Sequence, residues 1–160
     1  MRLRYNNITK AYLITIILFI LFISTIVFPL LCLYLFPNAG IAYYIIKWQN
    51  YFLFTIPILL YFIINGVYIY NININPYSIT ITSHRIIADF FNTKEHIDIA
   101  HNMIKGYSFF NRPFTINNTI VIKLGHRNKK VIKRFNMSLI SKKQIKEISK
   151  ALDSIIVKHN

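Results

Sequence analysis

Residues 11–36 contain no charged side chain. As an α-helix this run would be roughly 39 Å long, which exceeds the roughly 30 Å thickness of a bilayer's hydrocarbon core. A second uncharged run, residues 51–70, has about the 20 residues that one membrane crossing needs. Pro29 lies inside the first run, and membrane helices tolerate proline. The sequence therefore predicts two transmembrane helices, at 11–36 and 51–70.

A cleaved signal peptide explains the first run less well than a retained helix does. The uncharged run is about twice as long as the apolar part of a signal peptide, and no small-x-small cleavage site follows it cleanly. Cys32, the single cysteine of the chain, follows Leu31, where a lipoprotein signal has a small residue. One cysteine also excludes a disulfide within the chain and a thiolate zinc site.

The composition agrees with a membrane protein. Hydrophobic residues make up 54% of the 160 residues and charged residues 15%. Two buried helices of a soluble core are the competing interpretation, but a small soluble domain rarely has so apolar a surface. The formal net charge of +14 indicates an anionic partner, either lipid head groups or nucleic acid. The abundance of Ile, Asn, Phe and Tyr also indicates AT-rich codons, which raise the lysine count without selection for binding.

The basic residues predict the orientation of the two spans. The segment 1–10 carries three basic residues, the loop 37–50 carries Lys47 alone, and all others follow residue 70. By the positive-inside rule, residues 1–10 form a cytoplasmic tail, 37–50 an external loop and 71–160 a cytoplasmic domain.

Asn65 lies close to the end of the second uncharged run. Its amide is a candidate for a hydrogen bond to the first span, and an amide placed at the membrane interface is the alternative interpretation.

The pattern changes after residue 70 from uncharged runs to alternation. Tyr77, Ile79 and Ile81 alternate with polar residues, which is typical of a β-strand with one buried face. Residues 125–128 contain Gly and Asn and fit the turn of a hairpin. The further strands that we predict are 85–91, 95–100, 103–110, 119–124 and 129–135.

The chain closes with a predicted amphipathic helix. Ser141 and Gln144 fit a capping box at its start. The residues of its apolar face are Ile145, Ile148, Leu152, Ile155 and Ile156, and those of its basic face are Lys142, Lys146 and Lys150. The apolar face needs a partner, and the strands supply one. We therefore expect an α+β, mainly-β domain of about six or seven antiparallel strands and one helix.

The domain resembles a known family in its first residues. YSIT at 77–80, followed by HRII at 84–87, is similar to the domain start in bacterial pleckstrin-homology-like (PH-like) proteins, the membrane-flanked domain family. The stretch from Ile97 to Phe110, and then residues 119–122, is similar too. The resemblance covers residues 11–158. It implies a partly open antiparallel β-barrel capped by the C-terminal helix, a bacterial cytoplasmic (inner) membrane protein, and no enzyme.

The chain departs from this family before the strand that begins at Thr119. Asn117 and Asn118 stand where the family often has glycines, and Asn also tolerates positive φ. The N-x-[ST] matches at Asn7, Asn117 and Asn136 are expected by chance in a chain so rich in Asn.

Few residues have the types and spacing that catalysis or metal binding needs. His96, Asp98 and His101 form an H-x-D-x-x-H pattern, which the polar face of a strand explains better than a metal site does. Glu147 and Asp153 lie on the terminal helix and are expected to be solvated. Four glycines make a phosphate-binding loop improbable. We predict no cofactor, no metal and no enzymatic activity.

A cluster of basic residues remains, and we call it the basic hairpin. It consists of Lys123, Arg127, Lys129, Lys130, Lys133 and Arg134. One interpretation is contact with anionic lipid head groups, to which each basic side chain contributes about 1 kcal/mol near the surface. The other is a strand edge that lysines protect from pairing. Nucleic acid is a third, weaker candidate, because aromatic residues lie between the charges.

Together these features predict a non-enzymatic integral membrane protein with a cytoplasmic PH-like interaction or scaffold domain. The alternative is a small accessory subunit that joins a larger transport or secretion complex through its two helices. Asn65 would then contact that membrane partner.

Overall fold

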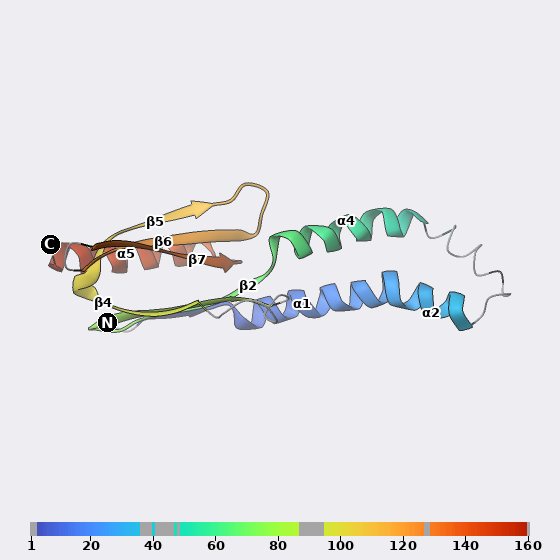
Figure 1. Cartoon of the computed structure of the whole chain (residues 1–160), viewed down its shortest axis with the longest axis horizontal. Helices are drawn as coiled ribbons and strands as arrows, with labels where there is room; N and C mark the ends of the chain where they lie inside the picture. The colour runs from blue at the N-terminus through green and yellow to red at the C-terminus, as the bar shows by residue number, and fades with distance from the viewer. Residues whose placement is uncertain are drawn as a thin grey trace. The chain divides into compact units, whose positions relative to one another are not determined.

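The computed structural model describes residues 3–35, 40, 47, 49–86, 95–126 and 129–159 (Figure 1). The fold is α+β, with an N-terminal helix, two antiparallel sheets and a C-terminal helix. The chain divides into two compact units. The strand unit combines Met1–Ala11 with Val67–Asn160, and the helical unit is Tyr12–Gly66.

The first helix is continuous but changes its winding at one point. It consists of α1 (Ile8–Phe22), a π-helical turn η1 (Ile23–Val27) and α2 (Phe28–Leu35). Pro29 has no N–H with which to bond one turn back, and the π turn ends two residues before it, at Val27. The part Ile8–Cys32 is long and apolar enough to cross a membrane, and its buried residues are Ala11, Leu18 and Thr25.

The second apolar helix, α4 (Gln49–Asn65), corrects the predicted boundary of the second span. The helix ends at Asn65, where Gly66 adopts a positive φ of 70° and its N–H donates to Phe62 O. A residue with positive φ ends a helix in this way. Residues 68–70, predicted inside the membrane, belong instead to strand β2, and Tyr70 is fully buried there. The apolar part of α4 within the described residues, Tyr51–Asn65, is shorter than a full span.

The first sheet corrects the prediction for the N-terminus. Its strands are β1 (Leu3–Asn6), β2 (Tyr68–Ile74), β3 (Ser78–Arg85) and β4 (Glu95–Ala100), in that order and all antiparallel. The expected cytoplasmic tail 1–10 therefore contains an edge strand of this sheet, which pairs Leu3 with Ile74 and Asn6 with Asn71. The helical unit is thus inserted between two neighbouring strands of one sheet.

Strand β3 confirms the first predicted strand. Ile79 and Ile81 are buried and Thr80 between them is partly exposed. Tyr77, which was predicted on the same buried face, instead precedes the strand and is 85% exposed. The strand predicted at 85–91 falls mostly on residues 87–94, which lie outside the described residues. Strand β4 has the bounds that were predicted.

The second sheet contains β5 (Ile104–Asn111), β6 (Asn117–His126) and β7 (Lys129–Ser138) in the order β5-β6-β7. The predicted hairpin of β6 and β7 is confirmed, with Ile120 opposite Phe135 in the core. Asn117 and Asn118 are the first residues of β6 and not a turn before it. Gly125 is also inside this strand.

Helix α5 (Lys142–His159) closes the core, as its pattern predicted. The capping box forms, since Gln144 N donates to Ser141 Oγ at 3.1 Å and Ser141 N to Gln144 Oε1 at 3.0 Å. The basic face is exposed, and the apolar face packs on both sheets. The buried residues of α5 are Ile148, Ala151, Leu152 and Ile155.

Two carboxylates of α5 contact tyrosines. Asp153 is exposed, as expected, whereas Glu147 is partly buried, which corrects the expectation that it is solvated. Tyr5 Oη donates to Glu147 at 2.9 Å, and Tyr107 Oη donates to Asp153 at 2.7 Å. Burial, together with these carboxylates, raises the pKa of Tyr5 and of Tyr107. The helix is thereby hydrogen-bonded to β1 on one side and to β5 on the other.

Tyr70 makes the free energy of unfolding depend on pH under alkaline conditions. Burial raises its pKa from 10.0 to about 12. Since the folded pKa lies above the unfolded value, the stabilisation is complete below pH 10 and is lost as the pH rises toward 12. The free energy of unfolding should therefore fall by about 1.4 kcal/mol per pH unit in this window through Tyr70 alone.

Denaturant unfolding of the full chain in detergent between pH 9 and 11.5 measures this slope. Tyr70→Phe should be less sensitive to pH than the wild type, whereas Tyr77→Phe, at a side chain that is 85% exposed, should match it. Parallel curves for all three proteins would contradict the assignment.

Candidate functional site

The strand register divides the basic hairpin between two faces of the sheet. Lys123 lies opposite Ile132, Arg134 opposite Val121, and Lys133 opposite Ile122. Because neighbouring side chains of a strand point to opposite faces, Lys133 lies on the face of the buried Ile122, and Arg134 lies on the other. All three cations are exposed.

The other three residues of the basic hairpin are less fully described. Lys129 and Lys130 lie on β7, opposite His126 and Gly125, and their side chains fall outside the described part. Arg127 falls outside the described residues altogether. Strand β7 is the last strand of its sheet, and such edges commonly carry lysine. The basic hairpin is therefore an edge with charges on two faces, and its described cations do not form one surface patch.

The strand unit has two ends, which the two ends of the β6–β7 hairpin define. At one end, β6 begins at Asn117 and β7 ends at Ser138, and these two residues are paired. The opposite end of the same hairpin has His126 paired with Lys129. The ten-residue strand β6 separates the ends by roughly 30 Å at 3.3 Å per residue. We call them the attachment end and the far end.

A buried amide network marks the attachment end. Asn7 is 3% exposed, and its Nδ2 donates to Tyr68 O and to Ser138 O, each at 2.8 Å. Its Oδ1 accepts from Tyr70 N at 2.9 Å. Ser138 Oγ accepts from Tyr68 N and donates to Asn117 Oδ1. Since Asn7 precedes α1 and Tyr68 follows α4, both connections to the helical unit leave the strand unit at this end.

Sequence reasoning missed this network. Asn7 was noted as an N-x-[ST] match, and Asn117 as such a match and as a turn residue in place of a family glycine. Neither pattern predicts a buried amide. The available signal was position: Asn7 stands directly before the uncharged run, where the chain has to leave its sheet.

The H-x-D-x-x-H residues separate in the structure. His96 and Asp98 are exposed on β4, where Asp98 accepts a hydrogen bond from Thr80 Oγ1 at 3.3 Å. His101 is buried on the short 3-10 helix that follows. Within the described ranges, no group of three metal-ligating side chains comes together.

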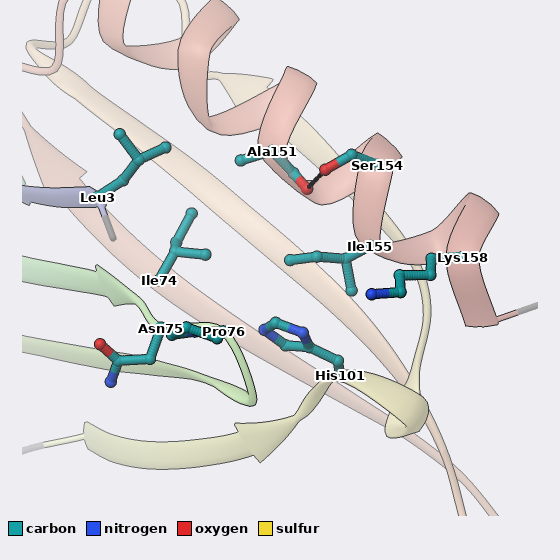
Figure 2. A pocket seen from close by; sticks show the side chains of 9 residues that line it. All are labelled: Leu3, Ile74, Asn75, Pro76, His101, Ala151, Ser154, Ile155 and Lys158. Atoms are coloured by element: carbon teal, nitrogen blue, oxygen red, sulfur yellow. Dashed lines mark hydrogen bonds between the residues drawn. The ribbon is translucent and has the colours of Figure 1, made fainter. Parts of the chain in front are cut away.

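A pocket of about 300 Å³ opens at the far end (Figure 2). Its residues come from the N-terminal strand, the β2–β3 turn, the 3-10 helix and the end of α5. They are Leu3, Ile74, Asn75, Pro76, His101, Ala151, Ser154, Ile155 and Lys158. Figure 2 shows Lys158 and His101 on the same side of an otherwise largely apolar lining. Sequence patterns could not predict it, because it joins the two termini of the chain.

The helical unit has a polar contact that was not predicted. Ser24 Oγ and Tyr51 Oη lie 3.1 Å apart and join η1 to α4. Asn65 Nδ2 donates to Tyr61 O at 3.0 Å, one turn earlier in its own helix. The proposed bond from Asn65 to the first helix stays a prediction.

Neither the models of known protein families nor the curated protein sequences gave a match to this chain.

Proposed function

We propose that this chain is a non-enzymatic integral membrane protein with two spans and a PH-like cytoplasmic interaction domain, in a bacterial cytoplasmic membrane. The observation that carries the proposal is the insertion of the apolar helices between β1 and β2. Such an insertion holds the domain by two covalent connections at one end. Its far end, with the basic hairpin and the pocket, is then available to a partner.

The N-terminal strand supports a retained first helix. Leu3 to Asn6 form β1, and Asn7 donates to backbone carbonyls of β2 and β7. Cleavage of the apolar helix as a signal peptide would remove this strand and leave these carbonyls unsatisfied, at a cost of about 1–3 kcal/mol for each. A membrane helix that is retained keeps the sheet complete.

The order of elements supports the PH-like part of the proposal. After the helical unit come three antiparallel strands of the first sheet, three of the second sheet and one amphipathic helix, the strands-then-helix order that the family resemblance implies. The helix buries one face against both sheets. Fold alone does not name a ligand, so the partner has to come from the surface.

The position of the basic hairpin bears on which partner it binds. Its tip lies roughly 30 Å from the attachment end, and screening limits charge attraction to about 8 Å at physiological ionic strength. A lipid contact of the tip therefore requires that the strand unit lean toward the bilayer, whereas an acidic macromolecule in the cytoplasm can reach the tip in any orientation of that unit. For this reason we favour an acidic macromolecule over the anionic head groups as the partner of the basic hairpin.

Single-cysteine labelling tests the proposed topology. In a Cys32→Ser background, Asn38→Cys in the loop should react with a membrane-impermeant maleimide in intact cells. Lys158→Cys, exposed on α5, should react only after the cells are opened. The protein should stay in the membrane fraction after a carbonate wash.

The Cys32→Ser chain without an added cysteine is the control and should not react. Release by carbonate, or labelling of Lys158→Cys in intact cells, would contradict the proposal.

A further inference from the structure

We propose that the β5–β6 loop inserts Phe114, together with Phe110 near the end of β5, into the membrane interface. The inference rests on the proposed function, since it requires that the helices lie in a bilayer. It assigns a second, non-covalent contact between the strand unit and that bilayer.

The loop lies at the attachment end of the strand unit. Residues 112–116 join β5 to Asn117, which accepts a hydrogen bond from Ser138 Oγ. Ser138 in turn contacts Asn7 and Tyr68, where the chain leaves for the helices. Figure 1 likewise shows the loop at the arrowhead end of β7. The loop is therefore beside the two covalent connections and not at the far end.

Phe114 has an unusual conformation and an unusual exposure. The residue is 96% exposed, and its φ is +60°, a value that a bulky residue rarely adopts. Phe110, on the neighbouring end of β5, is 56% exposed. In water, the exposed apolar area of the two rings is unfavourable, and so is the backbone conformation of Phe114. Burial of the rings in an apolar phase removes the unfavourable exposure.

The loop holds Phe114 in a defined position. Thr115 Oγ1 donates to Arg112 O at 3.0 Å and accepts from Asn117 N at 3.3 Å. At the end of the loop, Ile116 O accepts a hydrogen bond from Leu139 N at 3.0 Å. These bonds fix both sides of the turn, so little conformational entropy remains to be lost when the ring is buried.

The charges around the loop favour an anionic bilayer as the surface that the loop contacts. The segment from residue 99 to 146, which includes β5, β6 and β7, contains no acidic residue, and Arg112 is exposed within the loop itself. Aromatic rings next to basic side chains are the composition of segments that lie in an anionic membrane interface. Because the chain is already tethered there, one or two rings suffice to orient the domain.

Tryptophan scanning of the full chain tests the inference. In a Trp48→Phe background, three variants each carry one tryptophan: Phe114→Trp at the loop, Tyr77→Trp at the far end and Phe19→Trp in α1. Tyr77 is a matched control, because it is an aromatic residue that is 85% exposed. The proteins are reconstituted in phosphatidylglycerol–phosphatidylcholine vesicles with or without brominated phosphatidylcholine.

We expect brominated lipid to reduce the emission of the tryptophans at 19 and 114 and to leave that at 77 unchanged. Emission at 114 should also shift to shorter wavelength on reconstitution. Quenching at 19 with none at 114 would overturn the inference and leave the proposed function standing. Equal quenching at 77 and 114 would overturn it too, because the domain would then lie along the bilayer. Absence of quenching at 19 would overturn the proposed function itself.

Discussion

Replacing residues 12–66 by a short glycine–serine loop should give a folded, water-soluble protein. The strand unit keeps the seven described strands and α5 in this variant, and the core cluster of the described residues includes none from the helical unit. Circular dichroism and a cooperative thermal transition would show the folded state. Aggregation or a non-cooperative transition would contradict the division into two units.

The fragment 71–160 should be compared with this variant, because it is the cytoplasmic domain whose bounds the uncharged runs predicted. It lacks β1, the first three residues of β2 and the amide of Asn7. Loss of the fully buried Tyr70 alone removes a core aromatic, a change that costs about 3–5 kcal/mol when a Phe or Trp is truncated to Ala. We expect the fragment to be unfolded, and a fragment as stable as the loop variant would refute the role assigned to the N-terminal strand.

Asn7→Ala should destabilise the strand unit by roughly 3 kcal/mol or more. The substitution leaves Tyr68 O, Ser138 O and Tyr70 N without the bonds that Asn7 now makes, and each unsatisfied buried group costs about 1–3 kcal/mol. Asn7→Asp should also destabilise, since a carboxylate has no proton to donate to the two carbonyls.

Asn6→Ala is the matched control, because the neighbouring Asn6 is exposed on β1. Its effect should stay within about 0.5 kcal/mol, as for most surface substitutions. Chemical unfolding of the full chain in detergent and of the loop variant measures both changes. Equal stability of Asn6→Ala and Asn7→Ala would contradict the network.

The elements that the sequence predicted well have local signals. The capping box and the apolar stripe of α5 lie within one helix, and the β6–β7 hairpin joins strands that are adjacent in the sequence. Periodicity and turn residues identify such elements without knowledge of the rest of the fold. The same holds for the first apolar helix, whose length and lack of charge suffice.

The elements that were missed depend on distant partners. Strand β1 has only four residues, LRYN, and its pairing with β2 is set by residues beyond the whole helical unit. The predicted end of the second span was wrong for another reason. Val67 to Tyr70 are apolar, and apolar residues are expected in a buried strand as well as in a membrane helix.

The candidate site was predicted by residue type but not by arrangement. The sequence identified the basic residues of the β6–β7 hairpin, and the register then placed Lys133 on a different face from Lys123 and Arg134. Neighbouring side chains of a strand point to opposite faces, so basic residues that are close in the sequence can lie on different faces of the sheet. The far-end pocket and the Asn7 network lay beyond prediction, since each joins the first residues of the chain to the last third.

The insertion of the helices between β1 and β2 also fixes the order in which the protein can be made. Strand β1 leaves the ribosome first, but its neighbour Asn7 can meet Tyr68 only when the chain has grown by 61 residues, and Ser138 only when it has grown by 131. Both apolar helices emerge in that interval. Strand β1 must therefore stay unpaired while the helices enter the bilayer, and it can pair with β2 only after both helices have been made. A chain whose helices fail to insert would present an open sheet edge, a form that proteases and chaperones recognise.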